Sequence, residues 1–297
     1  MNWELLREDE FEGAIKRSKG VCVIPMGCLE KHGEHLPVGT DSITADAIVK
    51  EACKIEDAVI FPVTHWLGTV MGAHAVKDPS ELKKYGFIGL NPHTLLTVLE
   101  ELCDEIARNG FTKILIVNAH GGNDSMLNFF KNSQCYNKKS YATMWTDACL
   151  FETISPKSLL ETITARKEDF SMITPSDIET LKQWQDKEDY LTLGHSGFSE
   201  TGLVYGSYPE LVEPKRFEKE SGLSTHRADY LNKEKVRFGY SWSSNFPNHI
   251  NGLQPVGCTK TIGQAMIKIC AERLAGVLKM LKADEEVLKM VKDGIPC

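Results

Sequence analysis

The segment EKHGEHLPVGTD, residues 30–41 of this 297-residue chain, restricts what the molecule can be more than any other segment. It places two glutamates, two histidines and an aspartate within twelve positions. Glu30 and His32 are two residues apart, so on an extended backbone both side chains point to the same side. Carboxylate oxygen and imidazole nitrogen are donors that zinc, manganese and iron accept. The segment is therefore either a solvated charge patch or part of a metal site.

The surrounding sequence favours the metal site. The apolar run of residues 21–27 ends at a glycine and is typical of a buried strand. In open α/β sheets, ligands collect at the carboxyl ends of strands, where Glu30 and His32 would emerge. Residues 41–53 have apolar side chains at helical spacing, which puts Asp41 near a helix N-terminus. The alternative is a solvated loop in which Asp41 serves only as the N-cap.

A second segment, KILIVNAHGGN at residues 113–123, repeats this arrangement. An apolar strand runs into His120, and two glycines after it allow a tight turn. A helix precedes the strand, with Asn91-Pro92 as its start and Gly110 as its end. We therefore predict that His120 lies at the carboxyl end of a strand. A histidine that only packs at a turn is the simpler alternative for this segment alone.

A third segment, GHSGFSETG at residues 194–202, surrounds His195 and Glu200 with small residues. Such a composition predicts a loop whose backbone closely approaches another part of the molecule. An ordinary glycine-serine loop is the alternative, and the segment alone favours it.

Taken together and in this order, the three segments resemble the creatininase (creatinine amidohydrolase) family. The resemblance implies a dinuclear metal hydrolase in which the first segment supplies Glu30, His32 and a bridging Asp41. The second segment would supply His120, and the third would complete the ligand set with Glu200. His195 aligns with a family histidine placed beside the substrate, which makes it a candidate proton donor. His35 also matches a recurrent family histidine, to which we assign no role.

The chain also departs from the family pattern. The family's small-Ser-x-Glu-His segment is absent, and residues 71–78, which include His74, stand in its place. Gly122 occupies a position where creatininase has a glutamate, and Phe198 replaces a glutamate that many members have. These changes leave the predicted metal ligands intact but argue against creatinine itself as the substrate.

The pattern of the whole chain predicts an α/β fold. Apolar strands at 21–27, 58–64, 113–119 and 141–147 alternate with helical segments, the last of them at about 259–282. This alternation favours a three-layer α/β/α sandwich with a mostly parallel central sheet. No linker or composition break divides residues 1–297, so we expect a single domain. Regions near 156–190 and 206–256 read as insertions that wall the site or meet another subunit.

Composition excludes several classes of partner. The net charge is −7 and the pI about 5.8, with no basic run, which argues against nucleic acid. No apolar stretch reaches the ~20 residues needed to span a bilayer, and the N-terminus lacks a signal pattern. Nine cysteines without Cys-x-x-Cys spacing suggest a reduced, cytoplasmic chain. Cys28 could be a soft metal ligand, but the motif already supplies enough nitrogen and oxygen donors.

These observations predict a metal-dependent amidohydrolase acting on a small, cyclic amide. Two divalent ions per chain, zinc with zinc, manganese or iron, would activate a water that attacks the carbonyl carbon, and His195 would protonate the departing nitrogen. Family relatives that hydrolyse formamides or a cyclic ketone (3-dehydro-scyllo-inosose) are the alternative. A non-catalytic metal-binding protein and a metal-dependent isomerase or lyase are further alternatives. The resemblance also implies a homo-oligomer such as a hexamer.

Overall fold

Four parallel strands form the central sheet of the computed structural model, which describes residues 1–70, 86–185, 194–251 and 255–294. Their order across the sheet is β2-β1-β3-β4, with bounds β1 Val21–Met26, β2 Val59–Ile60, β3 Lys113–Asn118 and β4 Ala142–Asp147. Val21 pairs with Lys113 and Met26 with Asn118, so β1 and β3 end side by side. The chain leaves β1 for β2 on one side and returns to β3 on the other. The carboxyl ends of β1 and β3 therefore form a topological switch point, where open α/β sheets bind ligands.

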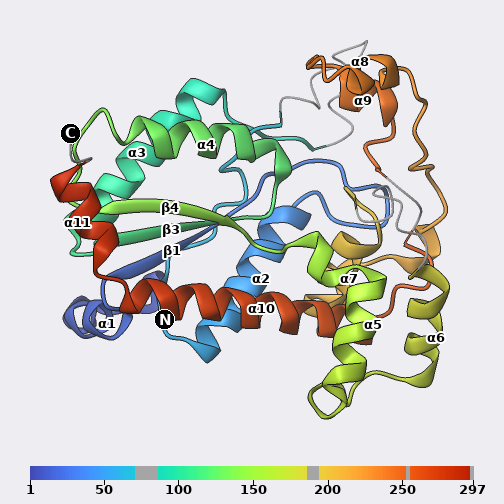
Figure 1. Cartoon of the computed structure of the whole chain (residues 1–297), viewed down its shortest axis with the longest axis horizontal. Helices are drawn as coiled ribbons and strands as arrows, with labels where there is room; N and C mark the ends of the chain where they lie inside the picture. Colours follow the sequence, from blue (N-terminus) through green and yellow to red (C-terminus); the bar gives the residue numbers. More distant parts are fainter. Residues whose placement is uncertain (71–85, 186–193, 252–254, 295–297) are drawn as a thin grey trace.

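Helices cover both faces of this sheet, because alternate residues of each strand point to opposite sides. Val21 and Val23 pack in one core with residues of α2 (Thr40–Ile55) and α10 (Lys260–Ala283). Cys22 and Ile24 pack in a second core with α1 (Phe11–Ser18), α3 (Pro92–Arg108) and α4 (Asp124–Ser133). Figure 1 shows α3 and α4 above the sheet and α10 below it. The predicted three-layer α/β/α sandwich is confirmed.

The predicted elements are present with small changes of bounds, except for the strand at 58–64. That strand is only two residues long. Phe61 still donates its N–H to Val23, but Pro62 has no N–H with which to continue the ladder. The outer side of β2 is covered by the N-terminus, where Asn2 bridges to Ile60. The edge of the sheet is thereby closed.

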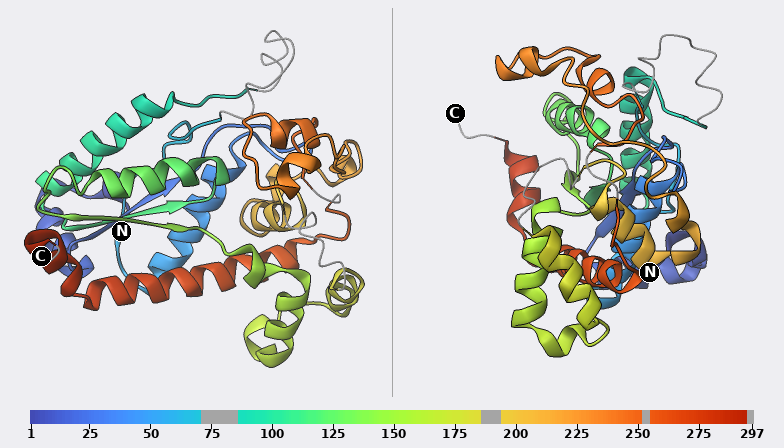
Figure 2. Two further views of the ribbon diagram at one scale, coloured as in Figure 1. Left: turned by 45° about the horizontal axis from the view of Figure 1, so that its top comes forward. Right: turned by 90° about the vertical axis from the view of Figure 1, so that its right-hand side faces the viewer.

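The two regions expected as insertions have different structures. Within 156–190, helices α5 (Pro156–Ala165) and α6 (Pro175–Trp184) pack on each other, and α5 also contacts α10. Within 206–256, the chain is irregular, with two short helices, α8 (Asp229–Lys233) and α9 (Ser241–Asn245). Figure 2 shows α8 and α9, in orange, beyond the carboxyl ends of the strands. Helix α11 (Glu286–Asp293) follows α10 and contacts β4.

The prediction of a loop across residues 194–202 is wrong from Phe198 onward. Helix α7 (Phe198–Ser207) begins there, because Phe198 and Leu203 are buried in the core beside α2 and α10. The expected close approach does occur, but between helices. A Cβ atom on Gly263 of α10 would lie 2.1 Å from the carbonyl oxygen of Gly202 in α7.

Membrane insertion has no support in the helices: within the four described ranges, none is both long and apolar enough to cross a bilayer.

Candidate metal centre

The six side chains singled out in the sequence converge at the switch point of the sheet. Each comes from a short segment that follows a strand or begins a helix. The loop after β1 carries Glu30 and His32, the first turn of α2 carries Asp41, the turn after β3 carries His120, and the loop and first turn of α7 carry His195 and Glu200. Parallel strands bring these segments together because their carboxyl ends share one edge.

Asp41 occupies the middle of this group and is 2% exposed. Its Oδ1 atom lies 2.9 Å from His32 Nε2, and its Oδ2 atom lies 3.0 Å from His120 Nδ1. The two oxygens of one carboxylate therefore face two different histidines. A carboxylate in this position is suited to bridging two cations.

The potential ligand atoms form three groups, of which the first two share Asp41 and the third joins Glu30, His32 and His195. In the first group, His120 Nδ1 also lies 3.0 Å from Glu30 Oε1, and Cys28 completes the set. In the second group, His32 Nε2 lies 3.5 Å from Glu200 Oε2. We call these the His120 group (Cys28, Glu30, Asp41, His120) and the His32 group (His32, Asp41, Glu200).

Backbone carbonyl groups fix the tautomers of the three histidines. A carbonyl oxygen only accepts, so the ring nitrogen bonded to it carries the proton. Such bonds join His32 Nδ1 to Glu30 O (3.2 Å), His120 Nε2 to Thr69 O (2.7 Å) and His195 Nε2 to Lys31 O (2.7 Å). In each neutral ring the other nitrogen then turns its lone pair toward the carboxylates, which is how metal-binding histidines are held.

Charge in this buried cluster is strongly coupled. Burial opposes ionisation of Glu30, but the neighbouring His120 and His195 outweigh it and lower its pKa to about 2. Burial likewise opposes a positive His32, but Asp41 and Glu200 raise its pKa to about 10. The pKa of Asp41 is lowered for the same reasons, chiefly by His32 against its burial. The buried carboxylates are therefore stabilised by positive charge close to them. Divalent cations can supply this charge in place of the protons on the histidines.

Two asparagines of the second segment hold His120 in place. The Asn118 side chain donates to the His120 carbonyl (2.8 Å) and accepts from its N–H (3.2 Å). Asn123 donates to Asn118 Oδ1 and to the Gly27 carbonyl. Gly122 is required for space, because a Cβ atom there would lie 2.3 Å from His120 Nε2. A glutamate at position 122 would therefore displace His120 from this arrangement.

His195 lies on the more open side of the cluster, with 14% of its side chain exposed. Its ring packs on His32 with centroids 4.1 Å apart, and its Nδ1 lies 3.5 Å from Glu30 Oε1. The ring of Trp242 in α9 stands edge-on to His195 at 5.4 Å, and the ring of His249 lies 5.5 Å from that of Trp242. The segment from 242 to 251 therefore contacts the cluster at His195.

Trp242 and His249 were not singled out as site residues in the sequence. They come from an irregular segment without periodicity, and only tertiary contacts bring them to His195. A backbone bond from Asn251 N to His195 O (2.9 Å) ties the segment to the loop before α7. Burial, followed by the effect of His195, lowers the pKa of His249 to about 4.

Three further residues were named in the sequence analysis, and the structure describes two of them, His35 and Cys28. His35 is buried outside the cluster, where its Nε2 lies 3.0 Å from Thr201 Oγ1 and joins the first loop to α7. Cys28 is fully buried, and its Sγ lies 3.3 Å from Asp41 Oδ2. His74 and the rest of residues 71–78 lie outside the described residues.

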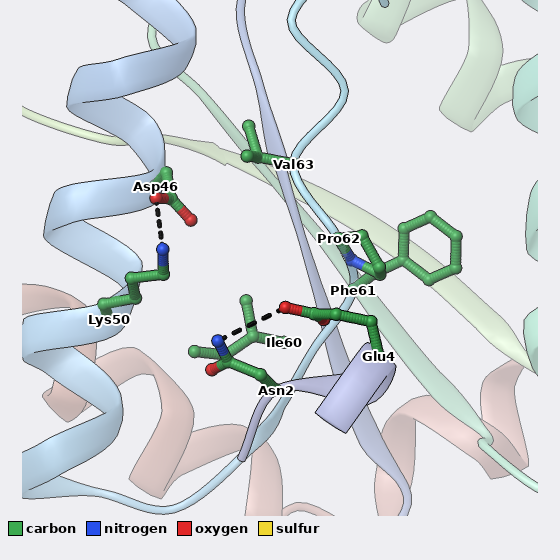
Figure 3. Close-up of a pocket in the computed structure, with 8 residues that line it drawn as sticks. All are labelled: Asn2, Glu4, Asp46, Lys50, Ile60, Phe61, Pro62 and Val63. Atoms are coloured by element: carbon green, nitrogen blue, oxygen red, sulfur yellow. Dashed lines mark hydrogen bonds and ion pairs between the residues drawn. The ribbon is translucent and has the colours of Figure 1, made fainter. Parts of the chain in front are cut away.

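A cavity of about 170 Å³ lies away from this cluster, at the β2 edge of the sheet. Figure 3 shows its polar side chains paired with one another: Asp46 with Lys50 (2.6 Å) and Asn2 with Glu4 (3.4 Å). The lining residues are Asn2, Glu4, Asp46, Lys50, Ile60, Phe61, Pro62 and Val63. None of them belongs to either ligand group, so we place the candidate function at the switch point.

The fold and the site together define a class: parallel α/β proteins with a candidate metal centre at the carboxyl edge of the sheet. Comparison with known proteins narrows the class. The creatininase (creatinine amidohydrolase) family model matches residues 4–278. Creatinine amidohydrolase of Pseudomonas putida is 23% identical over 278 residues, which cover 91% of this chain and 93% of that protein. The chain therefore belongs to the creatininase family and is a hydrolase of that family.

Solved structures agree with this assignment at the level of the fold. A manganese form of creatininase has a TM-score of 0.69 at 16% identity, covering 95% of this chain and 99% of that one. A variant creatininase of Zn–Zn type has a TM-score of 0.67 at 17% identity, covering 95% and 98%.

Proposed function

We propose that this protein is a metal-dependent amidohydrolase that hydrolyses a small cyclic amide. The observation that carries the proposal is the position of Asp41, whose two carboxylate oxygens face His32 and His120 separately. The family relation supports amide carbon–nitrogen bonds as the target, since the P. putida relative is a creatinine amidohydrolase.

The donor set fits two divalent ions per chain. Glu30, Asp41 and His120 would hold one ion, and His32, Asp41 and Glu200 would hold the other. Mixed nitrogen and oxygen donors suit zinc, manganese or iron, and the related structures include Zn–Zn and manganese forms. When bound, such ions polarise a carbonyl group and lower the pKa of water towards ~7.

His195 is the residue that we propose as proton donor to the departing nitrogen. Its Nε2–H is committed to the Lys31 carbonyl, so Nδ1 is the atom that delivers the proton toward the cluster. Nδ1 faces the ligand groups and lies 3.5 Å from Glu30 Oε1. Amines leave poorly without a proton, which gives the transfer its catalytic value.

The proposed substrate lies beside the contacting rings of His195 and Trp242, over the ligand groups. His195 and Glu200 are the most exposed of the six predicted site residues, with 14% and 12% of their side chains accessible, so a substrate would enter from their side. A flat, uncharged ring would pack against Trp242 while its carbonyl group points into the cluster. This arrangement supports a small cyclic amide.

Assembly and location are further parts of the proposal. Exposed apolar side chains gather around α8 and α9, among them Tyr230, Phe238 and Tyr240, each more than half exposed. A closed homo-oligomer, such as a hexamer, would cover them. All eight cysteines in the described ranges are free, which supports a cytoplasmic, reducing setting. Light scattering at micromolar concentration tests the assembly, and a monomer would contradict it.

The decisive experiment combines metal analysis with a substrate screen. Purified protein is analysed for metals by mass spectrometry and assayed against cyclic amides, creatinine, formamides and cyclic ketones, with products identified. We expect up to two transition-metal ions per chain and hydrolysis of a cyclic amide that the Asp41→Ala variant does not catalyse. Protein that carries no transition metal and gains none on incubation would refute the proposal. Cleavage of a cyclic ketone alone would refute the assigned substrate.

A further inference from the structure

We propose that Cys28 is a thiolate ligand of the ion in the His120 group, which makes the two metal positions chemically different. This inference rests on the proposed metal-dependent function. The proposed function uses only nitrogen and oxygen ligands, and this inference adds a sulfur ligand to one of the two metal positions.

The spacing of the four donor atoms is the first reason. Cys28 Sγ lies 3.3 Å from Asp41 Oδ2, and His120 Nδ1 lies 3.0 Å from both Asp41 Oδ2 and Glu30 Oε1. All four donor atoms lie within 4.8 Å of one another. A tetrahedral zinc ion with bonds of ~2.0 Å to nitrogen and oxygen and ~2.3 Å to sulfur has ligand–ligand edges of about 3.3–3.5 Å. Three of the six separations are therefore within about 0.3 Å of tetrahedral edges, and the other three do not exceed 4.8 Å.

The surroundings of Cys28 are the second reason. A cysteine that only fills space packs within an apolar core, as Cys22 of β1 and Cys103 of α3 do. Cys28 has such neighbours on one side, where Val70 and Phe87 pack against it. On the other side it meets two carboxylates and a histidine. It is fully buried, so its thiol is turned toward the ligand group rather than toward solvent.

The chemistry of binding balances simply. The Cys28 thiol releases its proton to solvent as the sulfur–metal bond forms, which is usual for cysteine ligands. The His120 group then offers sulfur, nitrogen and two carboxylates, whereas the His32 group offers only nitrogen and oxygen. Thiolate favours zinc over manganese, while the second set accepts either ion. We therefore expect one tightly held zinc per chain and a second, exchangeable position.

X-ray absorption spectroscopy of the zinc-loaded protein tests the ligand directly. Wild-type protein should show sulfur at ~2.3 Å in a share equal to one sulfur per two zinc ions. Cys28→Ala should lose this contribution, and Cys28→Ser, which keeps the shape of the side chain, should replace it with oxygen. Cys103→Ala is the matched control, since it removes a buried thiol far from the cluster and should leave the spectrum unchanged.

Metal exchange provides a second readout that does not depend on activity. After dialysis of the zinc protein against excess manganese, wild type should retain about one zinc per chain, and Cys28→Ala should retain at least tenfold less. Zinc bound by wild type with only nitrogen and oxygen neighbours, unchanged in Cys28→Ala, would overturn the inference and leave the proposed function intact. Wild-type protein that binds no zinc at all would instead refute the proposed function.

Discussion

Asp41 and His120 are held 3.0 Å apart, oxygen to nitrogen, although one begins α2 and the other follows β3. Neither residue reaches the other by local structure. The parallel pairing of β1 with β3 brings the ends of both strands together, and α2 starts from the loop that follows β1. Both side chains are buried, so their contact depends on the packed sheet and not on flexible surface groups. The candidate metal centre is therefore a property of the fold.

The shared position of Asp41 leads to the first prediction. Asp41→Ala should remove both metal ions, because each ligand group loses one of its members, whereas Glu30→Ala should weaken chiefly the ion of the His120 group. Metal content by mass spectrometry after gel filtration measures both effects. Asp46→Ala is the control, since Asp46 lies in the same helix but pairs with Lys50. Full metal content in Asp41→Ala would show that the carboxylate does not bridge.

The second prediction concerns Glu200, which belongs only to the His32 group. Glu200→Ala should lose one ion per chain together with activity, and the ion of the His120 group should remain. Because Glu200 also accepts the Ser196 N–H, Glu200→Gln tests the charge while it retains that bond. Metal stoichiometry and thermal unfolding of both variants separate a lost ligand from a damaged loop. Two ions in Glu200→Ala would rule out its assignment as a ligand.

The third prediction concerns the aromatic ring of Trp242. Trp242→Ala should raise KM by about 2- to 13-fold, corresponding to the ~0.5–1.5 kcal/mol that aromatic contacts contribute. The metal content should stay unchanged, because Trp242 contacts His195 and is not a member of either ligand group. Tyr136→Ala is the control, since Tyr136 is 91% exposed and lies outside the 242–251 segment. Equal KM values for the two variants would place the substrate elsewhere.

The fourth prediction concerns the effect of pH on folding. Burial lowers the pKa of His35 to about 4, so the unfolded chain takes up a proton near pH 6.5 that the folded chain refuses. Stability is therefore lost as the pH falls below 6.5, until the folded state also binds the proton near pH 4. His35→Gln removes this group while keeping a hydrogen-bond partner for Thr201. Between pH 7.5 and 5.5, wild type should lose about 1 kcal/mol more unfolding free energy than the variant.

Urea unfolding with a chelator present measures this difference, since metal uptake then contributes to neither protein. Equal losses in wild type and His35→Gln would mean that His35 does not titrate between those pH values on unfolding.

The sequence predicted the parts of the site that follow strands. Glu30, His32 and His120 each come after an apolar run, and parallel pairing places such residues at one edge of a sheet. The α/β fold and most element bounds were also predicted, because the spacing of apolar residues in strands and helices is a local property of the sequence. The strand at 58–64 was shorter than predicted because Pro62 cannot extend the ladder.

Features that depend on tertiary contacts were not predicted from local pattern. The helix that begins at Phe198 has many small residues and is stabilised by burial against α10, so its composition resembled a loop. Trp242 and His249 come from a segment without periodicity, and their place beside His195 depends on how that segment folds back. The sequence shows how many donor residues there are but not how far apart their atoms lie. Cys28 therefore seemed unnecessary as a ligand.

The last prediction separates proton transfer from metal binding. If His195 donates a proton to the leaving group, His195→Ala should keep both ions and lose roughly 10²–10⁴-fold in kcat. His195→Gln keeps a donor for the Lys31 carbonyl and should lose as much, because it cannot deliver a proton from the position of Nδ1. The loss should shrink for substrates whose leaving group departs without protonation. Metal stoichiometry and kcat on both variants decide the matter: near wild-type turnover in His195→Ala would exclude the proton-donor role, and loss of an ion would make His195 a ligand instead.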